Sequence, residues 1–516
     1  MFRHSLANHF LEYSAARLPH KVALIHQDLR LTYAEIDGMS NRLAHFFLKS
    51  GVERGDRIAI FMDNSIEAII SVFGALKSGA AFMMINHTTK AEKLQYILNN
   101  SRAGVLLTQG SRAGIIKGLN CPALKTVIVT GPCDNGHHIS LDEVMRSEIS
   151  LPVQTRCIDL DLASIIYTSG STGQPKGVML SHLNMISAAH SITTYLENTE
   201  NDIIINVLPL SFDYGLYQML MAFSVGGTLI LEKSFIYPYQ VVDVMSREKV
   251  TGLPGVPTIF ALLLHLKDID KYDFSSLRYI TNTAAALPVS HIFRLRELFP
   301  QAKLYSMYGL TECKRVSYLP PEELHSRPTS VGKGMPNEEV YIVNEKGNRV
   351  GPGEMGELVI RGSNVMMGYW EMPEETCNCI RQGRYPGERV LYSGDLFRMD
   401  DEGYLYFVAR KDDIIKCKGE KVSPKEIENV LYSLHGILEA AVIGVQDEIL
   451  GEAIKAFVAL ESGSRLTEKD ILYYCSQHLE NYMMPKYIVM TDSLPKTTTG
   501  KLNKRLLAEQ MEEKKG

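Results

Sequence analysis

The first half of the chain alternates between short apolar runs and amphipathic segments with helical periodicity, and this alternation limits the possible folds most strongly. The apolar run Ile58–Phe61 follows Asp56-Arg57 and is followed in turn by a helical pattern from Ile66 to Lys77. Strands that alternate with helices are typical of parallel sheets with helical crossover connections, so the pattern predicts an α/β fold. The segment from Thr32 to Glu35 has the form of a capping box and should start a helix. Further strands are expected at Gly104–Thr108, Thr126–Thr130, Ser164–Tyr167, Ile203–Val207 and Thr228–Leu231.

A chain of 516 residues exceeds what one core normally supports, so two or more domains are expected. Hydrophobic residues make up 45% and charged residues 22%, which is an ordinary globular composition. The net charge of −5 provides no basic field for nucleic acid or an anionic membrane, so no nucleic-acid partner is expected. The longest apolar stretch, Tyr217–Leu231, is too short and too interrupted by glycine to span a membrane, and is expected to be buried core.

The N-terminus and the cysteines indicate a cytoplasmic protein. The segment from Met1 to Leu18 lacks a continuous apolar region, so no secretory signal is expected. Eight cysteines in a chain of this length are too sparse for a disulfide scaffold. Cys377 and Cys379 are one residue apart with no second pair nearby, so a zinc site is not expected.

The pattern changes near residue 338. Val340–Val343, Glu357–Ile360 and Tyr404–Val408 are short strand candidates separated by glycine-containing turns, which predicts a small β subdomain over about 338–411. A compact α+β tail follows, in which the Ser423–Glu426 segment combines a capping box with proline at the first helical position. We therefore expect an N-terminal domain over 1–411 and a small, mobile C-terminal lid domain over 412–516.

One loop carries a pattern typical of phosphate binding. The segment Tyr167–Val178 follows an apolar run and is rich in glycine and small hydroxyl residues, with Lys176 near its end. Glycines allow backbone conformations closed to other residues, and hydroxyl groups add hydrogen-bond donors for phosphate oxygens. It is not a Walker A loop, because the Gly-Lys-Ser/Thr ending is missing. The alternative is a flexible glycine–serine loop without function.

The loop resembles the phosphate loop of the adenylate-forming, AMP-binding superfamily, which contains acyl-CoA synthetases, peptide-synthetase adenylation domains and luciferase. Other segments resemble motifs of the same superfamily in the expected order across nearly the whole chain. They are Tyr308–Glu312, Gly356–Leu358 with Arg361-Gly362 and Gly368-Tyr369, Tyr392–Asp395, Arg410–Gly419 and Leu494–Lys501.

The resemblance implies an enzyme that binds ATP and Mg²⁺ and joins a carboxylic acid to AMP. It assigns catalytic roles to Thr168, Glu312 and Lys501, with Glu312 holding the Mg²⁺ and Lys501 reaching the site from the small domain. Asp395 should accept the ribose hydroxyls, Arg410 should assist there, and Asp412 should be the hinge. The implied nucleotide-binding residues are Thr168, Ser169, Gly170, Ser171, Thr172, Gly173, Lys176, Thr283, Ala284, Ala285, Ala286, Tyr308, Gly309, Thr311, Asp395, Phe407 and Arg410.

Each of these residues also has an ordinary structural explanation. Glu312 could be a solvated loop acid, Asp395 a turn residue after Gly394, and Lys501 one exposed cation among several near the C-terminus. Their combination in motif order favours the functional interpretation.

The resemblance also implies transfer of the acyl group from the adenylate to the thiol of a phosphopantetheine arm, for which Gly419 should leave room. Phe212-Asp213 stands where many fatty and aryl acid ligases carry histidine, and where amino-acid-activating relatives carry Phe-Asp. An amino or imino acid loaded onto a carrier protein is therefore the first interpretation, with Asp213 pairing the substrate ammonium. If Asp213 is instead a helix N-cap, an acyl-CoA ligase for an uncharged fatty or aryl acid is the alternative.

The resemblance to one subgroup of the superfamily is less specific than the resemblance to the superfamily. The segments Ser211–Gln218, Arg278–Pro288 and Met307–Pro321 resemble stand-alone carrier-protein ligases and exosortase-associated acyl-CoA ligases. A nucleotide-binding regulator without turnover is a further alternative, which the joint presence of Glu312, Asp395 and Lys501 disfavours. The chain also departs from the family pattern, since Ala284 and Ala409 stand where glycine is common.

Overall fold

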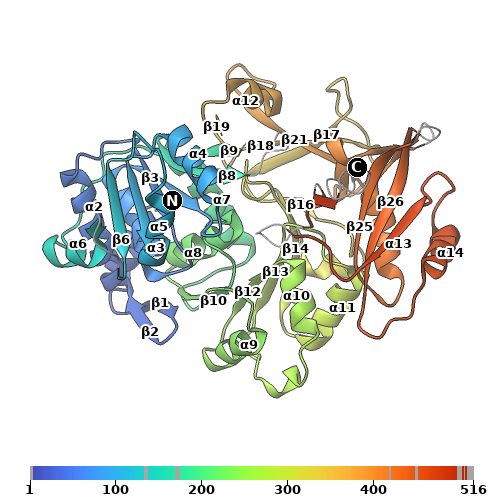
Figure 1. Ribbon diagram of the computed structural model, residues 1–516, viewed down its shortest axis with the longest axis horizontal. Helices are drawn as coiled ribbons and strands as arrows, with labels where there is room; N and C mark the ends of the chain where they lie inside the picture. The colour runs from blue at the N-terminus through green and yellow to red at the C-terminus, as the bar shows by residue number, and fades with distance from the viewer. Residues whose placement is uncertain are drawn as a thin grey trace.

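The computed structural model describes residues 4–132, 138–168, 175–417, 420–447, 451–496, 502–504, 506 and 507. Over these residues the chain forms three sheets in its N-terminal part and one in its C-terminal part. Figure 1 shows the C-terminal part, coloured orange to red, at one side of the molecule. The predicted α/β class, with a large N-terminal domain and a small α+β tail, is confirmed.

The first sheet has a parallel centre and antiparallel edges. Strand β1 pairs with β11 in parallel, and β11, β10, β12, β13 and β14 continue in the same direction. At the edges the pairings are antiparallel: β2 pairs with β1, β15 with β14, and β16 with β15. In spatial order the strands are β16 (Lys333–Gly334), β15 (Ser317–Leu319), β14 (Lys303–Tyr308), β13 (Tyr279–Asn282), β12 (Gly252–Gly255), β10 (Ile203–Asn206), β11 (Thr228–Leu231), β1 (Val22–His26) and β2 (Leu29–Thr32).

The second sheet repeats this plan. Its strands β8, β4, β3, β5, β6 and β7 are parallel, whereas β9 and β19 close one edge in the antiparallel direction. In spatial order the strands are β19 (Gly368–Tyr369), β9 (Lys176–Ser181), β8 (Leu162–Thr168), β4 (Ala81–Ile85), β3 (Arg57–Phe61), β5 (Val105–Gln109), β6 (Thr126–Thr130) and β7 (Ile139–Ser140). The strands predicted at Thr126–Thr130 and Thr228–Leu231 match β6 and β11 residue for residue.

Two buried helices, one from each large sheet, pack against each other. Helix α3 (Ile66–Ser78) packs on β3 and β4, and helix α8 (Asp213–Val225) packs on β10 and β11. The rings of Phe73 and Phe223 stack between these helices with their centroids 5.6 Å apart. This contact explains the apolar side chains of α8, which is core between the two sheets, as the sequence predicted for Tyr217–Leu231.

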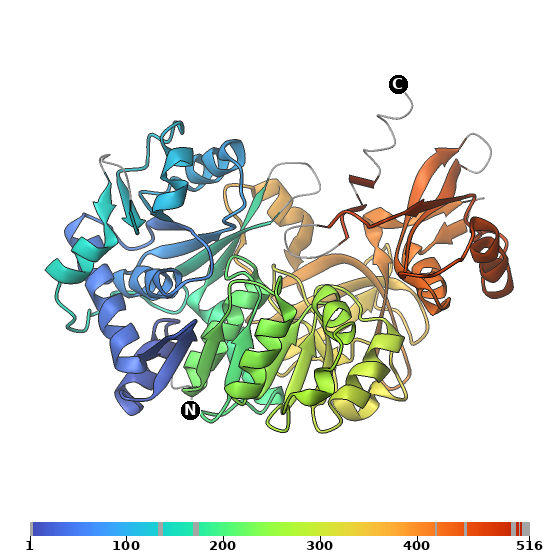
Figure 2. The same ribbon diagram turned by 60° about the horizontal axis from the view of Figure 1, so that its bottom comes forward.

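The remaining helices of the N-terminal part lie mostly on the outer faces, and Figure 2 shows α9, α10 and α11 in green to yellow-green in front of the first sheet. Helix α2 starts with the predicted capping box, in which Thr32 and Glu35 satisfy each other's backbone N–H groups. These helices are α1 (His9–Arg17), α2 (Tyr33–Lys49), α4 (Ala91–Ser101), α5 (Ala113–Ile116), α6 (Leu141–Ser147), α7 (His182–Tyr195), α9 (Pro238–Arg247), α10 (Pro257–Leu264), α11 (Val289–Leu298) and α12 (Pro373–Cys379).

The predicted β subdomain is an antiparallel sheet. Its strands, in spatial order, are β17 (Glu338–Val343), β18 (Gly356–Gly362), β21 (Arg389–Met399) and β20 (Ile380–Gln382), with β22 (Leu405–Arg410) paired to β21. A short turn of helix over Lys411–Asp413 leads out of β22 into the tail.

The tail has an apolar core of its own, which begins at Ile415 and shares no residue with the main core. Its sheet contains β24 (Glu420–Val422), β23 (Ile415–Cys417), β26 (Gly451–Leu460), β25 (Ile437–Asp447) and β27 (Tyr487–Thr491), flanked by α13 (Pro424–Ser433) and α14 (Glu468–His478). The predicted helix start at Pro424 is correct, but the capping box is not formed. The Ser423 hydroxyl instead donates to the carbonyl of Val408 at 2.6 Å and links the tail to β22.

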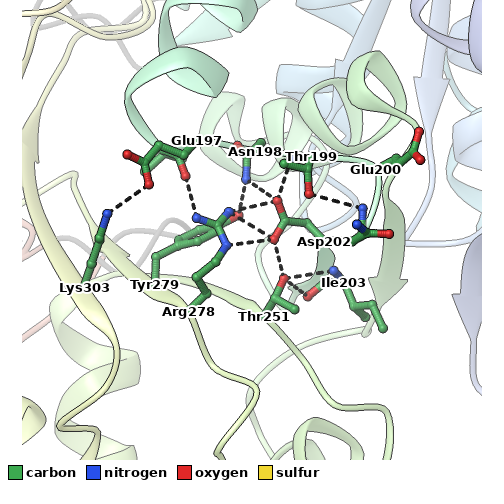
Figure 3. Close-up of polar contacts among 12 residues, drawn as sticks. Glu197, Asn198, Thr199, Glu200, Asp202, Ile203, Thr251, Arg278, Tyr279 and Lys303 are labelled. Atoms are coloured by element: carbon green, nitrogen blue, oxygen red, sulfur yellow. Dashed lines mark hydrogen bonds and ion pairs between the residues drawn. The ribbon is translucent and has the colours of Figure 1, made fainter.

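A buried polar cluster fixes the amino ends of three strands of the first sheet (Figure 3). Asp202, Thr251 and Arg278 directly precede β10, β12 and β13. Arg278 Nη2 lies 3.0 and 2.9 Å from the two oxygens of Asp202, and the Thr251 hydroxyl donates to Asp202 at 2.8 Å. The backbone N–H of Thr199 donates to the same carboxylate at 2.8 Å. The cluster therefore holds these strands together at the edge opposite to their carboxyl ends.

Candidate active site

A pocket of about 940 Å³ lies at the carboxyl ends of parallel strands from both large sheets, beside the β subdomain. Ile85 and Thr168 end β4 and β8, whereas Thr283 and Gly309 directly follow β13 and β14. The crevice beyond the carboxyl ends of the strands is where open α/β sheets bind ligands. Motifs that are distant in the sequence, including Thr311, Glu312, Gly394 and Arg410, meet at this pocket.

Asp395 is held rigidly beside the pocket by a tyrosine and an arginine. Its side chain is buried, and its Oδ2 accepts a hydrogen bond from the Tyr308 hydroxyl at 2.5 Å. The pairing of β21 with β22 places Arg410 opposite, with Nε 3.0 Å from Asp395 Oδ1. Burial, and then the charge of Asp395, raises the pKa of Tyr308 well above its usual value, so the phenol stays protonated and donates. The carboxylate is thus fixed in one orientation.

Glu312 is oriented by Tyr369, whose hydroxyl donates to Glu312 Oε1 at 2.7 Å. Burial, and then the Glu312 charge, raises the pKa of Tyr369, so this phenol also remains a donor. The Lys176 ammonium lies 5.3 Å from the centre of the Tyr369 ring. Lys176 is opposite Thr168 in the pairing of β9 with β8, and both residues line the pocket. A carboxylate, a phenol and a cation from three segments therefore share one wall.

Glu312 fits a metal ion that receives its other ligands from a substrate. Among the residues that the structure describes, no group of three or more His, Cys, Asp or Glu side chains could hold a metal ion. Mg²⁺ commonly binds through one or two carboxylates together with substrate phosphates and water, so a single oriented carboxylate is a suitable donor set.

Phe212 and Asp213, the predicted substrate-binding residues, both line the pocket. Phe212 is the N-cap of α8, makes no side-chain cap hydrogen bond, and leaves Asp213 as the first helical residue. The interpretation of Asp213 as an N-cap is therefore wrong. Its Oδ2 lies 3.5 Å from the Nζ atom of Lys314, a side chain that is only 3% exposed. Burial lowers the pKa of Lys314 to about 7, although the Asp213 charge opposes this shift.

The sequence analysis did not single out Lys314 and Arg315, which both line the pocket. The Arg315 guanidinium lies 5.0 Å from the centre of the Tyr214 ring. Lys314 has a left-handed backbone with φ of +67°, and the Asn364 amide donates to the carbonyls on either side of it, at 2.8 and 3.1 Å. The sequence signal that could have indicated these residues is the pair of consecutive cations, Lys314-Arg315, shortly after Thr311-Glu312.

The predicted adenine segment is only partly on the pocket. Thr283 and Ala284 line it, whereas Ala285 and Ala286 are exposed and do not. Phe407 does not line the pocket either, and its ring packs edge-to-face against Phe397 at 5.5 Å.

Some predicted residues are not tested by this geometry. Asp412 is exposed in the turn that leads into the tail. Ser169, Gly170, Ser171, Thr172, Gly173, Gly419 and Lys501 lie outside the described residues. In the described part of the chain, every helix is too short or too polar to cross a bilayer.

Comparison with known proteins agrees with the motifs and the pocket. The AMP-binding enzyme family matches residues 11–370, and the AMP-binding enzyme C-terminal domain matches residues 426–501. A long-chain-fatty-acid–CoA ligase of Bacillus subtilis is 31% identical over 97% of this chain and 93% of its own length. A medium-chain acyl-CoA ligase of Rattus norvegicus is 31% identical over 98% of this chain and 87% of its own length.

Solved structures agree over almost the whole chain. An anthranilate CoA ligase in complex with anthranoyl-AMP superposes with a TM-score of 0.89 at 28% identity, covering 98% of this chain and 97% of its own. ATP-bound MatB from Rhodopseudomonas palustris gives the same score and identity, covering 98% and 99% of the two chains. The chain therefore belongs to the AMP-binding enzyme family, and it is an AMP-forming acid–thiol ligase.

Proposed function

We propose that this enzyme is an acyl-CoA ligase. A carboxylate oxygen of the acid attacks the α-phosphorus of ATP, and the bond to the β-phosphate oxygen breaks to release pyrophosphate. The thiolate sulfur of CoA then attacks the carbonyl carbon of the acyl-adenylate, and AMP leaves with the electron pair of the broken bond. The thiol proton is lost to solvent.

The pocket residues suit the first of these steps because an anionic nucleophile must approach a polyanion. The chain supplies charge and alignment at this point, not a nucleophile of its own. Asp395, oriented by Tyr308 and Arg410 beside the pocket, would accept ribose hydroxyls, and Lys176, which lines the pocket, would offset phosphate charge. Glu312 would hold Mg²⁺, which neutralises phosphate charge when bound. Lys501 would add a further cation from the tail.

The choice of CoA as acceptor rests on the relatives and on Asp213. Three of the four relatives described above are CoA ligases by name. Asp213 has Lys314 as an intramolecular cation, so a substrate ammonium would compete for a carboxylate that is already paired. This contact favours the CoA ligase over the amino-acid:carrier-protein ligase, which is the second candidate because Asp213 is a buried acid on the pocket wall.

The test supplies ATP, Mg²⁺ and a panel of fatty, aryl, dicarboxylic and amino acids, with either CoA or a phosphopantetheinylated carrier protein as acceptor. We expect AMP and an acyl-CoA thioester from a non-amino acid, measured by chromatography and mass spectrometry. Thioester formed only on the carrier protein, or only from an amino acid, would establish the second candidate instead.

A further inference from the structure

The acid pocket contains a buried guanidinium without a counter-charge. Arg315 is 1% exposed, and among the described residues its Nε has no hydrogen-bond partner and its guanidinium no ion pair. Arginine does not lose its proton in proteins, so this group stays charged in the folded chain. An unpaired buried charge is strongly destabilising, and such a group is normally retained where a ligand supplies the missing partner.

The neighbouring acid does not compensate this charge. Asp213 forms its ion pair with Lys314, whose ammonium also lies 4.4 Å from the centre of the Tyr217 ring. The ion pair of Asp213 is therefore made with Lys314, and among the described residues Arg315 has no ion pair of its own. Tyr214, which carries the guanidinium on its ring face, is itself fixed by donating to the carbonyl of Thr281 at 2.9 Å.

The backbone around Arg315 is held in a costly conformation. A non-glycine residue in the left-handed region, such as Lys314 at φ +67°, costs free energy and is over-represented at ligand sites. Asn364 donates to the carbonyls of Cys313 and Arg315 and so secures this turn from outside the pocket. The unfavourable backbone conformation of Lys314 is thus retained at the residue that precedes Arg315, which lines the pocket.

We propose that Arg315 is a specificity-determining residue that binds a second carboxylate of the substrate, so that the enzyme activates a dicarboxylic acid at one end. A planar guanidinium matches a carboxylate through two parallel hydrogen bonds, and no substrate ammonium is needed to balance Asp213. The inference rests on the proposed function, because it concerns the acid that the same site adenylates.

The experiment compares the dicarboxylic acids from malonate to suberate, each with its own monomethyl ester, as substrates for ATP- and CoA-dependent AMP formation. The ester keeps one reacting carboxyl and nearly the same length but loses the second charge. We expect a preference of about 10- to 100-fold in kcat/KM for one diacid over its ester, as for a charge-assisted hydrogen-bonded pair.

The variant Arg315→Met should abolish this preference by raising KM for the diacid, while KM for ATP and activity on the ester are retained. The control variant Lys93→Met removes an exposed cation that lines the same pocket but belongs to α4, and it should keep the preference. If Arg315 instead held the reacting carboxyl, Arg315→Met would impair diacid and ester equally.

Failure of the inference and failure of the proposed function give different results. Equal use of diacids and esters, or a preference for uncharged acids with CoA thioester still formed, would overturn the role of Arg315 and leave the ligase function intact. Absence of CoA thioester from every acid would overturn the proposed function. A preference that survives Arg315→Met would also refute the assignment.

Discussion

At the scale of single residues, the pocket contains one alanine, Ala284, whose backbone conformation should lower the free energy of unfolding. Ala284 stands where glycine is common, and it has φ of +74°. A side chain in this region meets the backbone unfavourably, whereas glycine does not. Strain of this kind persists where the surrounding structure fixes the conformation, here at the wall of the pocket.

Replacing Ala284 by glycine should stabilise the protein. We expect the free energy of unfolding to rise by about 0.5–1 kcal/mol, because relief of strain exceeds the extra entropy of unfolded glycine. Chemical unfolding without nucleotide measures the change. The control is Ala285→Gly, an adjacent exposed position without positive φ, which should lose stability or stay unchanged. Equal effects of the two substitutions would contradict the strain argument.

At the scale of elements, the sequence predicted what depends on local pattern. Strands β6 and β11 and the start of α2 were predictable because alternation and capping are encoded in adjacent residues. The cap at Ser423 was mispredicted because a tertiary partner, the Val408 carbonyl, takes its hydroxyl. The pairing of Asp213 with Lys314 depends on the packing of α8 against the segment after β14, and no local pattern reports that contact.

The polar cluster at Asp202 should contribute to stability by holding three strands together. Asp202→Asn should lower the free energy of unfolding at neutral pH by about 2–3 kcal/mol, because it removes the charge of a buried carboxylate that pairs with the half-buried Arg278. Glu197→Gln is the control, since Glu197 pairs with Lys303 at the surface and is 64% exposed. That change should cost less than about 1 kcal/mol. Equal losses in the two variants would show that the cluster does not fix the strands.

The free energy of unfolding that is lost in Asp202→Asn should depend on pH. Burial alone would raise the pKa of Asp202, but its hydrogen bonds with Arg278, Thr199 and Thr251 lower it overall. A carboxyl whose pKa is lowered by folding stabilises the folded protein at pH values above its unfolded pKa of about 3.9. That stabilisation is lost as the pH falls from there through the folded pKa. The difference between wild type and Asp202→Asn should therefore be largest near neutrality and shrink below about pH 4.

At the scale of the whole molecule, the separate core of the tail suits a lid that delivers one residue to the pocket. We predict that Lys501→Ala slows adenylate formation by about 10²- to 10³-fold, the usual cost of one preorganised electrostatic contact. Thioester formation from supplied acyl-adenylate should change only several-fold, because the proposed role of Lys501 belongs to the first step. Rapid-quench assays of each half-reaction measure both rates, and equal loss in both would refute the assignment.

The independence of the two apolar cores has a consequence for how such enzymes diversify. The described pocket is lined wholly by residues before Asp412, whereas Gly419, the position proposed for the thiol arm, belongs to the tail. Recombination at this junction would leave both apolar cores intact, since no core residue is shared, and would need to keep the hydrogen bond from Ser423 to the Val408 carbonyl. With the roles proposed above, a tail grafted from a relative should carry its acceptor preference into a chain that keeps its own acid preference.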